Sequence, residues 1–262
     1  MEYEIKAHSF FDLHSMIPKA KLNRYCESIP SISYTWIEGK SPTVDGGLKR
    51  FLSDTILTFK EAFQSTNYDL NAIDTFSNSE ELFDQLKNRQ SDLNKVQDVP
   101  VELLQYFQQS LEKLKVIFSY ELNFPLDTLS LSDYGPHNVI SDKDGKFYFI
   151  DFEFFGKDST AKLICDLYCH PRTAFNSRDL VSLVENLQLT EKDLENILLL
   201  LPAVALKWAY IVMRRAVDWE TLNFIGFSSE FDQPFSYFEY MENALSHRDI
   251  KSVLTIREYK SM

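Results

Sequence analysis

Three oxygen-bearing side chains, Asp133, Asn138 and Asp151, have types and a spacing that could do chemistry. The chain between the last two predicts a β-hairpin, because an Asp-Gly pair at 144–145 separates two short stretches of strand character. In such a hairpin Asn138 begins the first strand and Asp151 ends the second, so both lie at its open end. Asp133 precedes Asn138 by five residues, in a loop that can fold back to this opening. We therefore expect the three side chains to share one small site.

These residue types suit phosphate chemistry assisted by a metal ion. Asp and Asn offer the hard oxygen ligands that Mg²⁺ prefers, and Mg²⁺ usually keeps part of its water shell. Phosphoryl transfer also needs a carboxylate that orients the attacking hydroxyl and accepts its proton. Turns are rich in Asp and Asn for a second reason, since both side chains cap turns, so a purely structural role is the alternative.

The charge balance excludes some partners. Lys and Arg number 27 against 39 Asp and Glu, so the formal net charge is −12. A chain this acidic repels the nucleic-acid backbone and anionic membrane surfaces, and we expect neither as a main partner. Only seven glycines occur, and the first is Gly39, so neither of the common glycine-rich phosphate loops can be written in this chain.

Cysteine usage and hydropathy predict a cytoplasmic protein. The three cysteines have no paired spacing, and the N-terminus lacks a basic region followed by an apolar stretch, which indicates a reducing cytoplasm. The longest apolar run, 197–213, is interrupted by Pro202 and Lys207 and is short for a bilayer. We expect it to form a buried helix and not a membrane span.

Hydrophobic spacing outlines a mostly helical chain around the hairpin. Residues 1–16 predict a helix that ends before Pro18, and the β-prone stretches 20–25 and 32–37 predict a small hairpin that leads into a linker at 38–42. Helical spacing predicts further helices at 48–63, 80–86, 101–120, 180–187, 191–217 and 235–245. These elements together describe an α+β chain.

The segment 130–170 resembles the catalytic half of the aminoglycoside phosphotransferase and choline kinase family, which has the protein-kinase-like fold. In that family an Asp opens the catalytic loop, an Asn follows five residues later, and an Ile-Asp-Phe-Glu block follows a hairpin. Here these are Asp133, Asn138 and residues 150–153, and a later glycine and Asp-Leu pair match as well. The sequence of this loop is also similar to that of a bacterial subgroup found among surface-polysaccharide biosynthesis proteins.

The resemblance implies a role for each of these residues. Asp133 would be the catalytic base, and Asn138 and Asp151 would be the ligands of Mg²⁺. Asp166 would be a buried carboxylate that braces the catalytic loop, and the loop with its hairpin would occupy residues 130–156. The implied cofactors are ATP and Mg²⁺, and the implied partner is a small-molecule acceptor such as a sugar.

The chain before the catalytic loop resembles the small lobe of the same fold, but this resemblance is less specific. Residues 1–16 resemble its regulatory helix, with Glu4 as a candidate for the Glu of that helix, and 20–37 resemble its last two strands. The segment 34–41 resembles the hinge that holds adenine through backbone groups. The candidate nucleotide-binding residues are therefore Tyr34, Thr35, Trp36, Ile37 and Glu38.

The resemblance divides the chain into a partial small lobe with the hinge at 1–40 and a mostly helical large lobe, with the catalytic hairpin, at 41–262. Two features depart from the family pattern. A His usually lies two residues before the catalytic Asp, and here that position is Leu131, so the usual bracing of the loop is altered. The strands with the phosphate-covering loop and the ATP-anchoring Lys should precede residue 1. We therefore expect that a missing N-lobe or a partner chain completes the nucleotide site, or that this part of the lobe is lost.

Three further groups each allow two interpretations. Glu153 either assists a second metal ion or is a solvated strand end. His137 either touches substrate or is a loop histidine that bonds to backbone. Cys165, Cys169 and His170 lie close enough in sequence to resemble a metal cluster, but they lack a fourth ligand at a suitable spacing, so we expect buried thiols in a core helix.

The leading hypothesis is an ATP- and Mg²⁺-dependent phosphotransferase that acts on a hydroxyl of a small molecule. The alternative is a catalytically silent kinase-like binding or scaffold module, which the missing phosphate loop and Lys favour and the intact metal-site residues oppose. A third hypothesis is a metal-dependent phosphohydrolase, in which water replaces the acceptor at the same oxygens.

Overall fold

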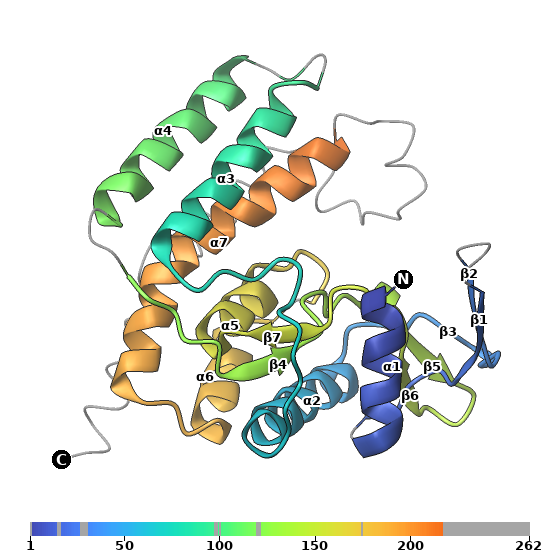
Figure 1. Ribbon diagram of the computed structural model, residues 1–262. Helices are drawn as coiled ribbons and strands as arrows, with labels where there is room; N and C mark the ends of the chain where they lie inside the picture. The colour runs from blue at the N-terminus through green and yellow to red at the C-terminus, as the bar shows by residue number, and fades with distance from the viewer. Residues whose placement is uncertain are drawn as a thin grey trace. The chain divides into compact units, whose positions relative to one another are not determined.

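The computed structural model describes residues 2–14, 17–26, 31–96, 99, 101–118, 122–173 and 175–216 (Figure 1). Backbone contacts group the chain into two compact units. The first comprises Met1–Thr75 and Pro125–Gln188, and the second comprises Phe76–Phe124 and Leu189–Met262. These boundaries do not test the expected division of lobes at residue 40, which stays a prediction.

The first unit begins with a helix and a two-stranded sheet. Helix α1 (Glu2–His14) is followed by strands β1 (Leu22–Cys26) and β2 (Ser31–Tyr34), which pair antiparallel. The helix ends before the proline at 18, and the predicted small hairpin is confirmed. The second strand ends at Tyr34, three residues earlier than expected, and the β-prone residues that follow it line a pocket together with the strand.

A third short strand pairs with the central hairpin. Strands β5 (Val139–Asp142) and β6 (Phe147–Phe149) pair antiparallel, and the turn between them holds Gly145 at φ 76°. This confirms the predicted hairpin, since an Asp-Gly turn favours positive φ. The expected linker at 38–42 is wrong in part, because β3 (Gly39–Lys40) pairs with β5. A Cβ on Gly39 would overlap the carbonyl of Ser141, so a residue without a side chain permits this pairing.

A long helix packs on a further strand pair, one strand of which leads into the catalytic loop. Helix α2 (Gly46–Ser65) begins at Asp45, whose side chain caps its first turn by accepting a hydrogen bond from an N–H at 2.9 Å. The helix packs on β4 (Thr128–Ser130), which pairs antiparallel with β7 (Gly156–Asp158). The sequence did not predict β7, because a strand of three residues carries no periodic pattern.

Two shorter helices complete the first unit. Every residue of α5 (Thr160–Cys169) is buried, including Cys165 and Cys169, which confirms the expected core thiols. Helix α6 (Ser177–Asn186) begins with a capping box between Asn176 and Asp179, in which each side chain accepts a hydrogen bond from the other residue's backbone N–H.

Aromatic rings form the core next to the catalytic hairpin. Phe11 of α1 contacts Phe152 and Phe155 at centroid distances of 5.0 and 4.6 Å, and Phe59 of α2 contacts Phe155 at 5.5 Å. Such pairs contribute roughly 0.5–1.5 kcal/mol each beyond the burial of their area. Because Phe152 directly follows Asp151, the packing of this core fixes the backbone that carries the candidate metal ligand.

The second unit is helical. Helices α3 (Ser79–Leu93), α4 (Val101–Ile117) and α7 (Glu191–Ala216) pack against one another (Figure 1). Phe107 of α4 stacks on Tyr210 of α7 at a centroid distance of 4.5 Å. The helices expected at 80–86, 101–120 and 191–217 are confirmed over their described residues, although α3 is longer than predicted and α4 ends at Ile117. The helix expected at 235–245 lies outside the described residues.

Helix α7 contains the apolar run noted in the sequence. Among the described helices, it alone is long and apolar enough to cross a membrane, over Glu191–Val212, and 72% of its most apolar window is buried. Core helices pass the same test of length and composition, and the burial agrees with the expected core helix.

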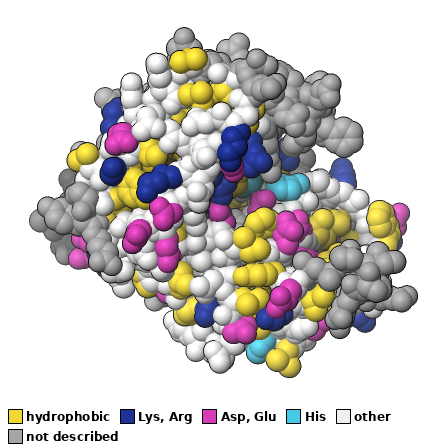
Figure 2. Space-filling model, turned by 45° about the horizontal axis from the view of Figure 1, so that its top comes forward, with side chains coloured by type: hydrophobic (Ala, Val, Ile, Leu, Met, Phe, Trp, Pro, Cys, Tyr) yellow, Lys and Arg dark blue, Asp and Glu magenta, His cyan; other side chains and the backbone are white. Residues whose placement is uncertain are grey.

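The acidic side chains are spread among basic ones on the face shown in Figure 2 and do not form a single patch there.

Candidate active site

The loop from β4 to β5 turns sharply before it presents Asp133. Ser132 has the left-handed φ of 63°, and its N–H donates to Ser130 Oγ at 2.9 Å. The Asp133 N–H then donates to the Leu131 carbonyl at 2.8 Å. Residues 136–138 form a 3₁₀ turn that leads into β5. The loop therefore holds Asp133 close to the start of the hairpin, as the sequence predicted.

The Asp133 carboxylate accepts hydrogen bonds on both oxygens. Gly135 N–H donates to Oδ1 at 2.9 Å, and His170 Nε2 lies 3.3 Å from the same oxygen. His137 Nε2 lies 3.3 Å from Oδ2. Burial alone would raise the pKa of Asp133, but the hydrogen bonds from His137 and His170 outweigh it and hold this pKa well below its usual range. Asp133 is therefore a carboxylate over the physiological pH range.

His170 is the site residue that sequence analysis missed. We expected it only as a neighbour of two buried thiols, but it follows the end of α5 and its ring reaches back to Asp133. Its Nδ1 accepts a hydrogen bond from the Arg172 N–H at 3.0 Å. Within the described part of the chain, no three His, Cys, Asp or Glu side chains are grouped as metal ligands. The one signal in the sequence was indirect, namely Leu131 in place of the family's usual bracing His.

Asn138 is fixed from two sides. Its Nδ2 donates to the Asp133 carbonyl at 3.2 Å, and its own carbonyl accepts from the Ile150 N–H at 2.9 Å. The side chain is buried, and the orientation of its amide leaves Oδ1 as the oxygen that can bind a cation. Asn138 and the end of β6 therefore meet at the open end of the hairpin, as predicted.

Asp151 lies two residues after β6 in the left-handed backbone region, at φ 65°. Its Oδ1 accepts only a long hydrogen bond, from the Glu153 N–H at 3.4 Å. Burial raises the pKa of Asp151, and the nearby Glu4 and Asp133 carboxylates raise it further. Asp151 thus lies among like charges that a cation would neutralise.

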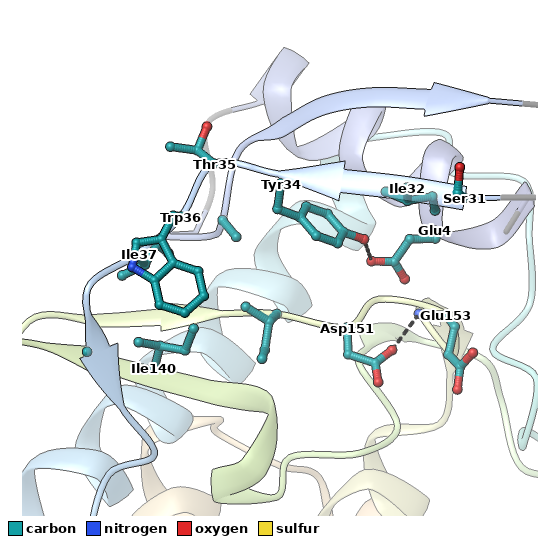
Figure 3. A pocket seen from close by; sticks show the side chains of 13 residues that line it. Glu4, Ser31, Ile32, Tyr34, Thr35, Trp36, Ile37, Ile140, Asp151 and Glu153 are labelled. Atoms are coloured by element: carbon teal, nitrogen blue, oxygen red, sulfur yellow. Dashed lines mark hydrogen bonds between the residues drawn. The ribbon is translucent and has the colours of Figure 1, made fainter.

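Glu4 of α1 contacts the same segment from above (Figure 3). Its Oε2 accepts from the Phe152 N–H at 2.7 Å, and its Oε1 accepts from the Tyr34 hydroxyl. Burial would raise the pKa of Glu4, but hydrogen bonds from His8, Tyr34 and the Phe152 N–H together lower it. The sequence offered Glu4 as the Glu of the regulatory helix, and in the structure it contacts a tyrosine, a histidine of its own helix and a backbone N–H.

A pocket of about 760 Å³ opens between β2 and the hairpin (Figure 3). Of the candidate hinge residues, Tyr34, Thr35, Trp36 and Ile37 line it, whereas Glu38 lines a separate pocket of about 350 Å³. The Thr35 N–H already donates to a backbone carbonyl at 2.8 Å, so it is engaged in the β1–β2 hairpin. The larger pocket therefore contains four of the five residues proposed from sequence.

The two ends of this pocket differ in chemistry. Trp36, Ile37 and Ile140 form an apolar end, and Glu4, Asp151 and Glu153 form an acidic one (Figure 3). No Lys or Arg is among the described residues that line it. The pKa of Glu153 is raised by burial and by the Asp151 and Glu4 carboxylates. This donor set fits a hard divalent cation such as Mg²⁺, held by a few protein oxygens and by water or phosphate.

Asp166 lies in the buried helix α5, away from solvent as expected. The Lys162 ammonium lies between two carboxylates, at 2.8 Å from Asp158 and 3.0 Å from Asp166. Burial would lower the pKa of Lys162, but these carboxylates and Asp74 raise it, so the ammonium stays charged. The expected bracing of the catalytic loop by Asp166 stays a prediction.

Comparison with known proteins adds to this geometry. No protein-family model and no curated protein sequence matches the chain. A choline/ethanolamine kinase family protein from Mesorhizobium loti matches with a TM-score of 0.58 and 11% identity, over 97% of this chain and 79% of its own. The protein-kinase-like fold is the fold of this chain.

Two further solved structures support this kinase-like fold. The gentamicin complex of APH(2")-IIa matches with a TM-score of 0.54 and 16% identity, over 84% of this chain and 75% of its own. The choline kinase LicA from Streptococcus pneumoniae matches with a TM-score of 0.52 and 13% identity, over 92% and 80%. LicA has also been solved in complex with AMP. The fold is of the α+β class, mostly helical with small sheets and a small N-lobe, as the sequence predicted.

Proposed function

We propose that this chain is an ATP- and Mg²⁺-dependent phosphotransferase that acts on a hydroxyl of a small molecule. One observation carries the proposal: Asp133, Asn138 and Asp151 lie at the open end of one hairpin, and Asp151 also lines the acidic end of the pocket. This arrangement brings a partly buried, ionised carboxylate, two candidate metal ligands and a nucleotide-sized pocket into one unit of the molecule.

Asp133 would act as the base. The acceptor hydroxyl gives its proton to the Asp133 carboxylate while its oxygen bonds to the γ-phosphorus of ATP and the bond from that phosphorus to ADP breaks. A carboxylate of lowered pKa is a weak base, so Asp133 mainly orients the hydroxyl and takes its proton late. No other residue is required to change its charge in this step.

Asn138 Oδ1 and the Asp151 carboxylate would hold Mg²⁺, which supplies the positive charge that phosphoryl transfer needs. The raised pKa of Asp151, caused by burial and then by the Glu4 and Asp133 carboxylates, supports this assignment, because a bound cation would favour the ionised carboxylate. Glu153 lines the same end of the pocket and is the candidate for assisting a second ion.

The apolar end of the pocket would take the adenine ring. Trp36, Ile37 and Ile140 offer flat and branched apolar surface next to the hinge segment. The AMP complex of LicA, a protein with the same fold, supports nucleotide binding here. The expected missing N-lobe or partner chain that would complete this site is a separate prediction.

Calorimetric titration tests the nucleotide and metal assignments. We expect Mg-ATP to bind the parent chain and to bind the Asp151→Ala variant at least tenfold more weakly, because one of two protein ligands of the ion is lost. Titration of ATP with EDTA is the matched control. Equal binding of Mg-ATP by the parent and the variant would contradict the metal site.

An acceptor screen then identifies the substrate. Sugars come first, because the catalytic loop is similar to that of the surface-polysaccharide subgroup. Choline, ethanolamine and gentamicin come next, since the printed names of the structural neighbours include them. We propose that the reaction takes place in the cytoplasm, where ATP is available, and that it involves neither nucleic acid nor a membrane span.

One observation favours a silent binding module as the second candidate. Glu4 binds Tyr34 and the Phe152 N–H, and no described residue of the pocket lining offers an ammonium or guanidinium to the phosphates. Mg-ATP binding without turnover of any acceptor, and without release of inorganic phosphate, would favour this module. Phosphate release without an acceptor would instead favour the phosphohydrolase.

A further inference from the structure

The two oxygens of Asp133 have different surroundings. Oδ1 accepts the Gly135 N–H at 2.9 Å and lies 3.3 Å from His170 Nε2, a ring whose side chain is only 4% exposed. Oδ2 lies 3.3 Å from His137 Nε2, and the His137 side chain is 39% exposed. One oxygen is therefore held by buried groups, and the other faces a ring that water can reach.

The hydrogen bonds of His170 fix its tautomer. The Arg172 N–H donates to Nδ1 at 3.0 Å, so Nδ1 acts as an acceptor and carries no proton. The proton of the neutral ring is then on Nε2, which faces Asp133 Oδ1. His170 can thus donate to Asp133 without a positive charge.

We infer that His170 is a positioning residue that holds Asp133 by Oδ1, so that Oδ2 is the oxygen that receives the acceptor's proton. The inference rests on the proposed function of Asp133 as the base. A carboxylate held by one oxygen keeps a single orientation, and a small misorientation of a reacting group can cost about a hundredfold in rate. The exposed His137 side chain is the group that the acceptor hydroxyl displaces from Oδ2.

The position of His170 agrees with this role. It is the first residue after α5, whose ten residues are all buried, so its backbone is set by the core and not by the catalytic loop. Asp133 lies on a loop with a left-handed residue directly before it, and this loop needs an external support. Leu131, which stands where the family usually has a His, cannot supply it.

Two substitutions separate the two hydrogen bonds of His170. In His170→Gln the side-chain amide reaches the position of Nε2, so a donor to Asp133 is kept while the acceptor for the Arg172 N–H is lost. In His170→Asn the amide oxygen takes the place of Nδ1, so the acceptor is kept and the donor to Asp133 is lost. A merely structural role predicts that Asn is the better replacement, and the positioning role predicts that Gln is.

The activity test uses hydrolysis or transfer of the γ-phosphate of Mg-ATP, with thermal unfolding of each variant measured in parallel. We expect His170→Asn to lower kcat about ten- to a hundredfold with the KM for ATP unchanged, and His170→Gln to stay within about threefold of the parent. Equal kcat in His170→Asn and the parent, or a better kcat in Asn than in Gln, would overturn the inference. If Asp133→Asn abolishes turnover, the role of Asp133 as the base is supported, whatever the kcat of the His170 variants.

A second measurement does not depend on activity. In the full chain with ¹⁵N-labelled histidine, NMR should find a proton on Nε2 of His170 and none on Nδ1, and Asp133→Ala should shift the Nε2 resonance by several parts per million. An unchanged His170 resonance in Asp133→Ala overturns the inference. If the parent chain does not turn over Mg-ATP, the proposed function is contradicted. The change in the His170 Nε2 resonance then decides by itself whether His170 holds Asp133.

Discussion

Asp151 combines two energetic costs in one residue. Its backbone lies in the left-handed region at φ 65°, which Asp tolerates better than most side chains do. Burial raises the pKa of its carboxylate, and the nearby Glu4 and Asp133 carboxylates raise it further. Residues that lower stability in this way without a structural benefit are typical of functional sites.

We therefore predict that Asp151→Asn stabilises the apo protein at pH 7. The folded pKa of Asp151 is raised, so the fold disfavours the ionised form, and this penalty is fully present above the folded pKa. The gain in unfolding free energy should stay below about 1 kcal/mol, because Asp151 is only partly buried and water screens its charge. Urea unfolding at pH 7 and at pH 3.5 checks this.

The pH dependence has a definite sign. As the pH falls below the usual Asp pKa of about 4, Asp151 is protonated in both the folded and unfolded states, and the advantage of Asp151→Asn should vanish. A variant less stable than the parent at pH 7 would mean that Asp151 supports the fold. Asp142→Asn is the matched control, since the pKa of Asp142 is lowered by backbone hydrogen bonds and its loss should act in the opposite direction.

The buried Lys162 stabilises the fold, in contrast to Asp151. Lys162→Met should lower the unfolding free energy by about 3–5 kcal/mol, because it leaves the Asp158 and Asp166 carboxylates buried without their ammonium. Lys95→Met removes the exposed pair with Asp92 and should cost far less, because water screens both charges. Chemical denaturation of both variants measures the difference, and similar losses would show that the buried group is hydrated.

At the scale of the elements, the short pair β4–β7 shows how a few backbone contacts set the position of the site. Gly156 in β7 lies so close to residues 71 and 72 that a Cβ would overlap their backbone, and the Asn71–Lys157 bridge joins the two segments. The β7 strand pairs with β4, which leads directly into the catalytic loop. Strand pairing here therefore controls where the loop begins.

We predict that Gly156→Ala lowers the unfolding free energy by more than about 2 kcal/mol, since the clash involves backbone that cannot rotate away. Gly46→Ala is the matched control, because a Cβ on Gly46 meets nothing within 4 Å and alanine favours the first turn of α2. Thermal denaturation distinguishes the two. A Gly156→Ala protein as stable as Gly46→Ala would mean that β7 is not packed on residues 71–72.

The elements also explain what the sequence could predict. The hairpin and most helices were predictable, because an Asp-Gly turn and a 3.6-residue period are local signals. Strands β3 and β7 were not, since two or three residues carry no period. His170 and the partners of Glu4 were missed because their contacts join residues 37, 30 and 148 positions apart, and nothing local encodes such contacts.

At the scale of the whole molecule, the pocket and the catalytic loop both belong to the first unit. A ligand that binds this unit stabilises the residues it contacts by an amount set by its concentration relative to its Kd. Protection should therefore be uneven along the chain. The two segments that line the pocket are far apart in sequence but should respond together.

We predict that saturating Mg-ATP slows amide hydrogen exchange in residues 31–40 and 149–153. Exchange in α3 and α4, which are in the second unit, should change much less. Mass spectrometry of peptide fragments measures this, and the Asp151→Ala variant should lose most of the protection. Protection of α3 and α4 alone would place the nucleotide elsewhere.

The early segment of the chain leaves the central hairpin and returns to it. Ala20 N–H donates to the Phe149 carbonyl and the Phe149 N–H donates to the Pro18 carbonyl, both at 3.0 Å, while Gly39 and Lys40 pair with β5. During synthesis the first 40 residues must therefore wait until about 110 more have been added, which takes roughly 5–20 s at ribosomal rates. Until then the residues of β3 have no β5 to pair with, so the pocket between β2 and the hairpin cannot form before about residue 150 has been synthesised.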